Sequence, residues 1–492
     1  MGATYTAYNL RIIAVLTLGS LTFGYAYSVI SNTLGQPSFS AYFGLAGDDA
    51  YANAISGAVN GLFAAGGVFG AIHTGWMCES KGRKLTMNTA AAISIIGGAV
   101  QTGSVHIAMF LVGRFVNGWG IGMMVTLIPI YQAEISPPNA RGLLVGQHGT
   151  WIVTGYAIAG WVGVGAYYSP NDALQWRLPI SFSCLWPLML IALSPWVPES
   201  PRWLLTRGRR DDAWRIIAKL HGAADDEGMN YAREEFYQMS QQVQVDEAAW
   251  AQGGNRQLFT RRSYLERMWM GFFVQYASQT TGAMVIYLYA VQLYQNLGET
   301  GSIPLILGAT YVTVAAISNL VGALIMDKLG RIKLLIIGLS GCMISLSLVT
   351  AMVAEFAGTT NQAGNAMGVF FTFCFITFYG GGEIYPTHFR SQGMAWSIVG
   401  TFLSTLAYVE AAPTALANIE WRYYIIFVGL TLINIIVLWW WCPETKGLSL
   451  EEINGKFGDE VVVHFADASE KERAHLEATV GRGEELEDIG HG

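Results

Sequence analysis

Three charged motifs occur twice in this chain, about half its length apart. The first motif is Glu79 to Arg83, repeated as Asp327 to Arg331. The second is Glu134 to Arg141, repeated as Glu383 to Arg390. The third is Pro198-Glu199, repeated as Pro443-Glu444. The three offsets fall between 245 and 249 residues. Three different motifs that repeat at nearly the same offset indicate two homologous halves related by an internal repeat. The fold is therefore expected to contain two similar units.

Long apolar segments separate these motifs. Hydrophobic residues make up 52% of the 492 residues and charged residues only 13%, and the mean hydropathy is +0.36, which excludes an ordinary soluble domain. About twelve windows reach the roughly 20 apolar residues that a membrane-spanning helix needs. They lie near residues 10–35, 52–77, 85–104, 105–130, 143–167, 177–197, 266–296, 302–326, 332–356, 363–385, 392–417 and 421–442. The sequence predicts an all-α membrane protein with twelve transmembrane helices in two homologous six-helix halves, an architecture typical of transporters that rock one half against the other.

The distribution of basic residues predicts the orientation of the chain. Lysines and arginines occupy the short loops after the second, fourth, eighth and tenth spans, whereas the alternate loops carry acids. Positively charged loops stay in the cytosol, so both termini are expected there, in a multi-pass protein of the plasma membrane. The predicted domains are an N-terminal half (1–197), a cytosolic helical linker (198–265), a C-terminal half (266–442) and an acidic cytosolic tail (443–492).

Motifs of other functional classes are missing from the sequence. The five cysteines lack metal or redox spacing, and no nucleotide-binding loop, metal cluster or catalytic triad is visible. We therefore expect no enzyme activity, no cofactor or metal, and no nucleic-acid partner. The expected partners are a small-molecule solute and the lipid bilayer, with the monomer as the functional unit.

Four segments resemble the signatures of one family. They are Gly75 to Lys84 after the second span, Arg114 to Gly120 in the fourth, Pro198 to Trp203 after the sixth and Pro443 to Gly447 after the twelfth. Together they are similar to the sugar porters of the major facilitator superfamily over essentially the whole chain, and residues 411–424 and 446–453 most resemble fungal members. The resemblance implies the major facilitator fold and a secondary transporter that moves a sugar or sugar-like solute by alternating access.

Charges at the predicted cytosolic helix ends are candidates for a latch between the halves. They are Glu79, Arg83, Glu134, Arg141 and Glu199 in the first half, and Asp327, Arg331, Glu383, Arg390 and Glu444 in the second. Ion pairs among them would hold the halves together while the outward mouth is open, and what is known of sugar porters favours this role. The alternative is that these charges only anchor helix ends and set the topology.

The position that couples transport to protons has changed. Proton-coupled sugar porters carry Phe-Gly-Tyr-Asp in the first helix, opposite an arginine of the fourth helix. This chain has Ala26 in place of the aspartate and retains Arg114. Alanine cannot bind a proton, so the resemblance favours facilitated uniport over proton symport. The candidates for any remaining coupling are Arg114 and Glu410, which no motif explains.

The resemblance also assigns candidate substrate-binding positions. They are Phe23, His148, Gly149, Ser278, Gln279, Met284, Tyr289, Phe378, Thr401 and Phe402. Of the amides that hexose-binding members carry, Gln279 survives, whereas Gly149 and Met284 stand where a glutamine and an asparagine are expected. Phe378 aligns with the tryptophan that stacks on the sugar, and Tyr289 with the tyrosine that closes the outer gate. Because hydroxyl-binding amides are lost while aromatic rings are kept, the pocket is expected to favour a smaller, differently hydroxylated or less polar solute than glucose.

Other functions stay open on the sequence alone. A proton-coupled symporter, a carrier of an organic acid or other polyol-like metabolite, and a non-transporting nutrient sensor all fit the same helices. A carboxylate substrate would need an unpaired cation in the pocket, and Arg114 is the deep basic residue available. Solute flux in vesicles separates a carrier from a sensor, because a sensor would bind without accumulation or exchange.

Overall fold

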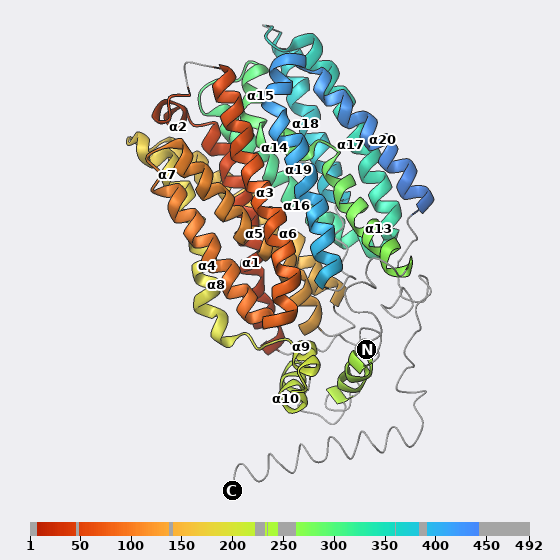
Figure 1. The fold of residues 1–492 in the computed structure, drawn as a ribbon. Coiled ribbons are helices and arrows are strands. Elements are labelled where there is room, and N and C mark those ends of the chain that lie inside the picture. Colours follow the sequence, from red (N-terminus) through yellow and green to blue (C-terminus); the bar gives the residue numbers. More distant parts are fainter. Residues whose placement is uncertain are drawn as a thin grey trace.

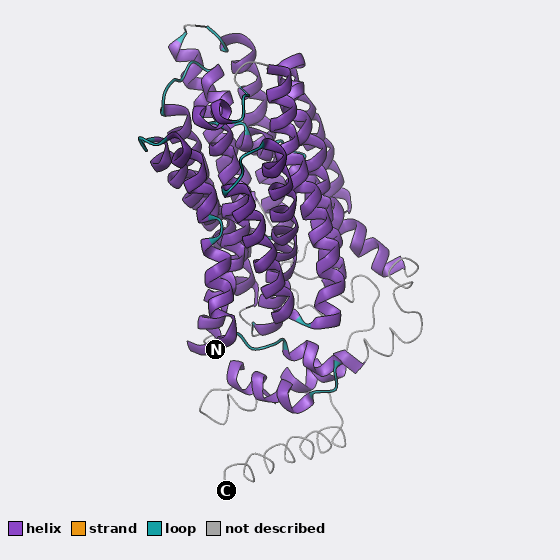
Figure 2. Ribbon diagram, turned by 60° about the vertical axis from the view of Figure 1, so that its left-hand side comes forward, coloured by secondary structure: helices purple, strands orange, loops and turns teal. Residues whose placement is uncertain are grey.

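A computed structural model describes residues 7–45, 49–136, 141–221, 232–233, 235–244, 262–359, 361–382 and 391–441. Every regular element in these ranges is a helix (Figure 2). By length and composition alone, eight of the described helices are long and apolar enough to cross a membrane. The chain therefore has the all-α architecture that its apolar windows predict.

The first half of the bundle is built from six spans. They are α1 (Ala7–Leu34), α3 (Asp49–Lys81), α4 (Arg83–Thr102), α5 (Ile107–Ile135), α6 (Arg141–Tyr167), and α7 (Asp172–Phe182) continued by α8 (Leu185–Leu193). The short helix α2 (Pro37–Tyr42) follows α1. The sixth span is interrupted between α7 and α8. Pro179 and Pro187 lie on either side of this interruption, and each removes a backbone donor from the helical ladder.

The second half also contains six spans among the described residues. They are α13 (Arg262–Gln279) with α14 (Ala283–Leu288) and α15 (Ala290–Asn296), then α16 (Ile303–Leu329), α17 (Arg331–Phe356), α18 (Gln362–Gly382), α19 (Ser391–Ile419) and α20 (Arg422–Trp441). The two halves lie side by side in Figure 1. This arrangement confirms the predicted fold of twelve spans in two six-helix halves.

The segment between the halves forms helices at one end of the bundle. These are the 3-10 helix η1 (Ser194–Trp196), α9 (Pro201–Thr206) and α10 (Arg210–His221), and α9 and α10 lie below the bundle in Figure 1. The helices α9 and α10 share a small core with residues 235–244, and this core includes Leu204, Ile217 and Phe236. The Trp203 indole nitrogen donates to the Glu79 carbonyl over 3.0 Å, which ties α9 to the end of α3. We call this end of the bundle the linker end and the other the opposite end.

Glycines set the spacing between α3 and α5. A Cβ atom at Gly122 would lie 2.2 Å from the carbonyl oxygen of Gly67, and one at Gly118 would lie 2.2 Å from that of Phe63. No larger residue fits unless the helices move apart. Such backbone contact is how helices associate closely in lipid, where packing rather than water expulsion drives assembly.

The seventh span is broken where it approaches the first half. Gly282 separates α13 from α14 and has φ +82°, a left-handed conformation that disfavours residues with a Cβ atom. A Cβ atom there would also lie 2.8 Å from the Phe427 ring. A second break at Tyr289 separates α14 from α15. Between these two breaks, Tyr287 contacts α1 of the first half, and Tyr289, at the second break, contacts α3.

Candidate functional site

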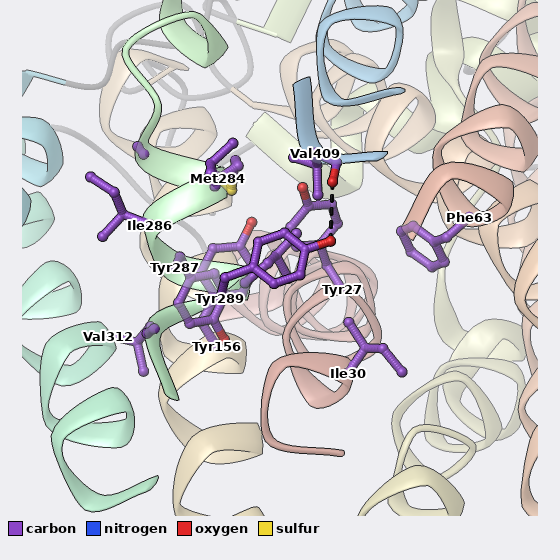
Figure 3. Close-up of a cluster of buried hydrophobic side chains, with 14 of the residues drawn as sticks. Tyr27, Ile30, Phe63, Tyr156, Met284, Ile286, Tyr287, Tyr289, Val312 and Val409 are labelled. Atoms are coloured by element: carbon purple, nitrogen blue, oxygen red, sulfur yellow. Dashed lines mark hydrogen bonds between the residues drawn. The ribbon is translucent and has the colours of Figure 1, made fainter. Parts of the chain in front are cut away.

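A small cavity lies where the two halves meet at mid-depth. It has a volume of about 30 Å³, and its walls include Val153 and Tyr156 of the first half with Met284, Tyr311 and Tyr379 of the second. Figure 3 shows Tyr156 and Met284 converging on this region. The volume is roughly that of one or two water molecules, whereas small-molecule pockets measure about 300–1,000 Å³. The halves must therefore separate here before a solute of sugar size can enter.

The helix α13 carries a row of two buried amides. Gln275 and Gln279 are four residues apart and share one helix face. The Gln275 side-chain oxygen accepts from the Thr401 hydroxyl at 3.3 Å, whereas Gln275 Nε2 and Gln279 Oε1 are buried without a hydrogen-bond partner among the described atoms. Tyr379 links this row to the cavity, because its hydroxyl lies 3.3 Å from that of Ser278. A buried polar atom left unpaired costs about 1–3 kcal/mol, so this row suits the hydroxyls of a ligand.

Aromatic rings form the first-half wall of the site. The rings of Tyr27 and Tyr156 have centroids 6.0 Å apart, and Tyr156 is stacked on Tyr287 at 5.6 Å, across the boundary between the halves. Phe23 meets Phe402 across the same boundary, edge to face at 6.4 Å. The candidate pair of Phe23 and Phe402 is thus brought together. One side of the site is apolar and the other carries amides and hydroxyls.

Tyr287 of α14 and Tyr289, at the break after it, close the interface toward the opposite end. The Tyr289 hydroxyl donates to the Val409 carbonyl at 3.0 Å and accepts from Asn60 Nδ2 at 3.1 Å, so it ties α3 to α19 (Figure 3). The Tyr287 hydroxyl is hydrogen-bonded to the Ser28 hydroxyl, and Ser31 donates to the Tyr287 carbonyl. The bonds to Asn60, Ser28 and Ser31 join the two halves, whereas the bond to Val409 lies within the second half. In this conformation the site is closed to the opposite end.

Phe378 is not brought to the site. Its side chain is 42% exposed and packs over Gly341 of α17, where a Cβ atom would lie 2.2 Å from the ring. The neighbouring residue, Tyr379, faces the cavity instead. The structure therefore corrects the expected position of the aromatic group on α18 by one residue.

His148 and Gly149 lie on α6, one turn or more from the cavity-lining residues of that helix. His148 is buried, and its Nδ1 lies 2.7 Å from the Ser20 hydroxyl of α1, so the imidazole faces the inside of the first half. Gly149 is buried beside it. Thr150, the next residue, reaches across to Asn319 of α16 with a 3.4 Å contact. Thr150 therefore contacts the second half.

Arg114 is a buried cation between α1, α3 and α5. Its Nε donates to the Val59 carbonyl at 3.2 Å, its Nη1 to the Ala26 carbonyl at 3.4 Å, and its guanidinium lies 4.2 Å above the Phe63 ring. Within the described ranges no carboxylate forms an ion pair with it. Backbone carbonyls and a ring face thus replace the acid that proton-coupled sugar porters carry at the position of Ala26.

Glu410 lies on the outside of the interface between α19 and α3. Its side chain is exposed and lies over two glycines of α3: a Cβ atom at Gly61 would be 2.9 Å from the Glu410 Cδ, and one at Gly57 would be 2.6 Å from the Glu410 carbonyl oxygen. The carboxylate is therefore not enclosed with Arg114, which is fully buried in the first half.

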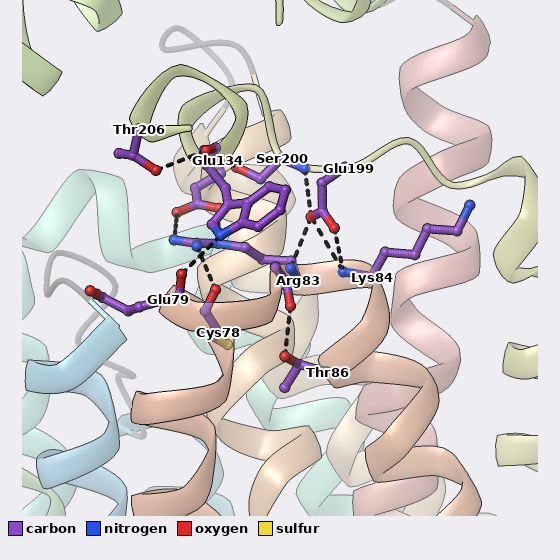
Figure 4. Close-up of polar contacts among 11 residues, drawn as sticks. Cys78, Glu79, Arg83, Lys84, Thr86, Glu134, Glu199, Ser200 and Thr206 are labelled. Atoms are coloured by element: carbon purple, nitrogen blue, oxygen red, sulfur yellow. Dashed lines mark hydrogen bonds and ion pairs between the residues drawn. The ribbon is translucent and has the colours of Figure 1, made fainter. Parts of the chain in front are cut away.

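Several of the candidate latch charges form one cluster at the linker end (Figure 4). Arg83 makes a two-pronged ion pair with Glu134, with distances of 2.6 and 2.8 Å, and both side chains are about nine-tenths buried. Glu199 accepts from the backbone N–H of Arg83 at 2.9 Å. Glu79 lies on the last turn of α3 beside this cluster (Figure 4). These contacts hold α4 to α5 and to the start of the linker within the first half.

The second-half latch candidates cannot be placed in this cluster. Glu383, Arg390 and Glu444 lie outside the described residues, as does the acidic tail. Asp327 and Arg331 lie in α16 and α17, but their side chains, like that of Arg141, are outside the description. A contact between the halves through these charges remains a prediction.

Sequence reasoning missed several residues of the site. Gln275 could have been found, because it lies one helical turn before Gln279 on the same face. Asn60, Tyr156 and Tyr287 had no such signal, because an amide or a tyrosine in an apolar span looks the same whether it faces a cavity, lipid or another helix.

Comparison with known sequences identifies the family. The chain matches the family described as Sugar (and other) transporter over residues 12–457. It belongs to this sugar transporter family. This sugar transporter is 28% identical to MFS-type transporter criB of Aspergillus cristatus, over 92% of this chain and 94% of the relative. It is 29% identical to Sugar transporter STL1 of Saccharomyces cerevisiae, over 89% of this chain and 80% of the relative. It is 27% identical to High-affinity glucose transporter 1 of Candida albicans, over 92% of this chain and 87% of the relative. The predicted resemblance to fungal sugar porters is confirmed.

A solved structure supports the fold of this sugar transporter independently. The proton:xylose symporter XylE of E. coli, bound to 6-bromo-6-deoxy-D-glucose, superimposes with a TM-score of 0.76 at 23% sequence identity, covering 92% of this chain and 100% of that chain. At this identity the likeness concerns the fold alone. It confirms a multi-pass membrane protein with the major facilitator fold.

Proposed function

We propose that this sugar transporter is a facilitative carrier that moves a sugar-like polyol across the membrane by alternating access. The observation that carries the proposal is the row of buried amides on α13, whose Gln275 Nε2 and Gln279 Oε1 atoms lack partners among the described atoms. Buried polar atoms in folded proteins are nearly always paired, so unpaired ones need an explanation. Hydroxyls of a bound polyol would supply both the donor and the acceptor that these two atoms lack.

The walls of the site favour a solute with fewer hydroxyls than glucose. The cavity is lined by Val153, Met284 and Ile376, which offer no hydrogen bonds, and its polar side chains are four tyrosines, Tyr156, Tyr287, Tyr311 and Tyr379. A site discriminates by polar groups that go unpaired with the wrong ligand, and here few such groups remain. The relatives include proteins named as transporters of glucose and as a sugar transporter, which fits a polyol without fixing its size.

Alternating access follows from the way the halves are joined. The Tyr287 and Tyr289 contacts close the opposite end, and the small cavity leaves no room for a sugar until the halves separate. Breaking these contacts would open the site to the opposite end. The charges at the linker end would then latch the halves there, through partners of Arg83 and Glu134 in the second half. The alternating closure of two ends around one site is the expected mode for a transporter of repeated halves.

Uniport is proposed because no carboxylate among the described residues pairs with Arg114. A proton-coupled carrier needs a carboxylate that gains and loses a proton within the membrane, and Ala26 offers only its backbone carbonyl to this arginine. Glu410 is exposed on the outside of the bundle and is separate from Arg114. Symport through Glu410 is the alternative, and proton influx linked to solute uptake would identify it.

The orientation is proposed from the charge distribution. With the linker end in the cytosol, both termini are cytosolic and the Tyr287–Tyr289 closure faces outward, as the positive-inside tendency predicts. We place the carrier in the plasma membrane, acting as a monomer on a small carbohydrate-like solute. An organic-acid substrate gains no support, because Arg114 does not line the cavity and is already bound to two carbonyls.

Flux in proteoliposomes tests the proposal. Purified protein should exchange one member of a panel of radiolabelled glycerol, pentitols, pentoses and hexoses without an imposed proton gradient. Gln275→Ala and Gln279→Ala should each lower the affinity for that solute, whereas Gln295→Ala, an exposed glutamine on α15, should not. Binding without exchange would show a sensor, and exchange unaffected by both α13 variants would place the site elsewhere.

A further inference from the structure

An aromatic cluster surrounds a histidine on the outside of the bundle. Phe69, His73 and Trp76 lie on α3, and Trp119 lies on α5; we call these four residues the α3–α5 aromatic cluster. The His73 ring is stacked on Trp76 at 5.8 Å and lies 5.6 Å from Trp119, and Phe69 meets Trp119 edge to face at 5.0 Å. The substrate site and the linker-end charges do not use any of these residues.

The cluster faces the membrane. Phe69 is 50% exposed and Trp76 is 64% exposed, on a span whose adjacent face packs closely against α5 through Gly66 and Gly70. His73 lies eight residues before Lys81 at the linker end of α3, which corresponds to a depth of about 12 Å along the helix. The 33 residues of α3 measure about 50 Å, and the hydrocarbon core is about 30 Å thick, so His73 lies just inside its boundary.

The hydrogen bond within the cluster fixes the protonation of the imidazole. Trp119 Nε1 lies 3.2 Å from His73 Nδ1. An indole N–H can only donate, so Nδ1 must accept, and the proton of the neutral ring is on Nε2. No hydrogen bond to Nε2 is found in the part of the chain that the structure describes. This donor lies near the hydrocarbon boundary, where an acceptor on a lipid would satisfy it.

We infer that the α3–α5 aromatic cluster binds a sterol-type lipid from the leaflet on the linker side. A sterol has one hydroxyl near the hydrocarbon boundary and a rigid, flat ring system below it. His73 Nε2 would donate to that hydroxyl, and the rings of Phe69 and Trp119 would lie against the fused rings. Phe69 lies one turn deeper in the membrane than His73, which is the direction in which the body of the sterol extends from its hydroxyl.

The rigidity of the cluster favours a sterol over an acyl chain. Trp119 is fixed by its bond to His73 and by the close packing of α3 on α5, so the cluster presents a preformed surface. A rigid ligand loses little conformational entropy on such a surface, whereas a flexible phospholipid chain loses much more. A phospholipid ester carbonyl is the other acceptor available at this depth, and the experiment below distinguishes the two.

The test uses the full chain in nanodiscs of phosphatidylcholine with a photoreactive, clickable sterol. Wild type should be labelled on the peptide that contains residues 69–81 or on the peptide around residue 119. His73→Phe keeps a ring and removes the donor, and it should lower labelling about fivefold. His73→Gln, which retains a side-chain N–H, should restore most of it. Trp439→Phe is the matched control, because Trp439 is an exposed membrane-facing tryptophan on α20.

Competition decides between ligand classes. Excess unlabelled sterol should abolish the labelling, whereas its 3-epimer, with the hydroxyl on the other face, and excess phosphatidylcholine should not. Equal competition by the epimer, or labelling that His73→Phe leaves unchanged, would overturn the inference and leave a nonspecific aromatic belt. Cross-linking of this face to a second copy of the chain would also overturn it. Binding is measured without transport, so the outcome is independent of the proposed carrier function.

Discussion

Removing one hydroxyl from the closed end of the interface tests how the two halves are held together. Tyr289→Phe keeps the ring in its buried position and deletes the bonds to Asn60 and to the Val409 carbonyl. Of these two bonds, the one to Asn60 joins the halves, with a net contribution of about 0.5–1.5 kcal/mol, whereas the one to Val409 lies within the second half. The lower half of this range is expected, because Asn60 Nδ2 also contacts the Ser56 carbonyl at 3.3 Å and is not left without an acceptor. The equilibrium should therefore shift about 2–5-fold toward the state open at the opposite end.

Distances between spin labels at Tyr51 of α3 and Gln295 of α15 would measure this shift, because both residues are exposed near the opposite end. The labels would be introduced in a background without the native cysteines. Tyr294→Phe is the matched control: it deletes a contact of 3.4 Å to Thr372, which lies within the second half. The Tyr289→Phe variant should populate longer distances, and the control should not. Identical distributions in both variants would refute the reasoning that these bonds hold the closed state.

Four further changes test other parts of the molecule. Collapsing the proton gradient with an uncoupler should leave initial uptake nearly unchanged, and substrate-linked proton influx would contradict uniport. Gln279→Ala should weaken solute binding by about 1–3 kcal/mol in a calorimetric titration at equal surface expression, and an affinity within a factor of two would show that the amide does not read the solute. Arg83→Ala and Arg331→Ala should both shift the equilibrium away from the outward-open state. Arg83→Ala should also lower thermal stability by about 3–5 kcal/mol, because it leaves Glu134 buried without its ion-pair partner. Gly122→Leu should reduce folded protein on size-exclusion chromatography, since its side chain would meet the Gly67 backbone, whereas Gly165→Leu, with open space around it, should be tolerated.

Periodicity and hydropathy in the sequence were enough to predict the spans and their number. Apolar length is set by the thickness of the bilayer and charge is excluded from it, so each span can be recognised without knowledge of its neighbours. The predicted windows therefore agree closely with helices such as α17 and α19. Local composition also explains the helical linker, because α10 is strongly amphipathic.

The rotation of each helix about its axis was decided by tertiary packing. A helix turns by about 100° per residue, so two adjacent positions point to different neighbours although both are apolar in sequence. Phe378 and Tyr379 show this: the glycine at 341 on α17 receives the phenylalanine ring and turns the tyrosine toward the cavity. The pairing of Arg83 with Glu134 is likewise a matter of distance between helices. The sequence determines what enters the membrane, and the contacts between helices decide which side chains face the solute, the lipid or each other.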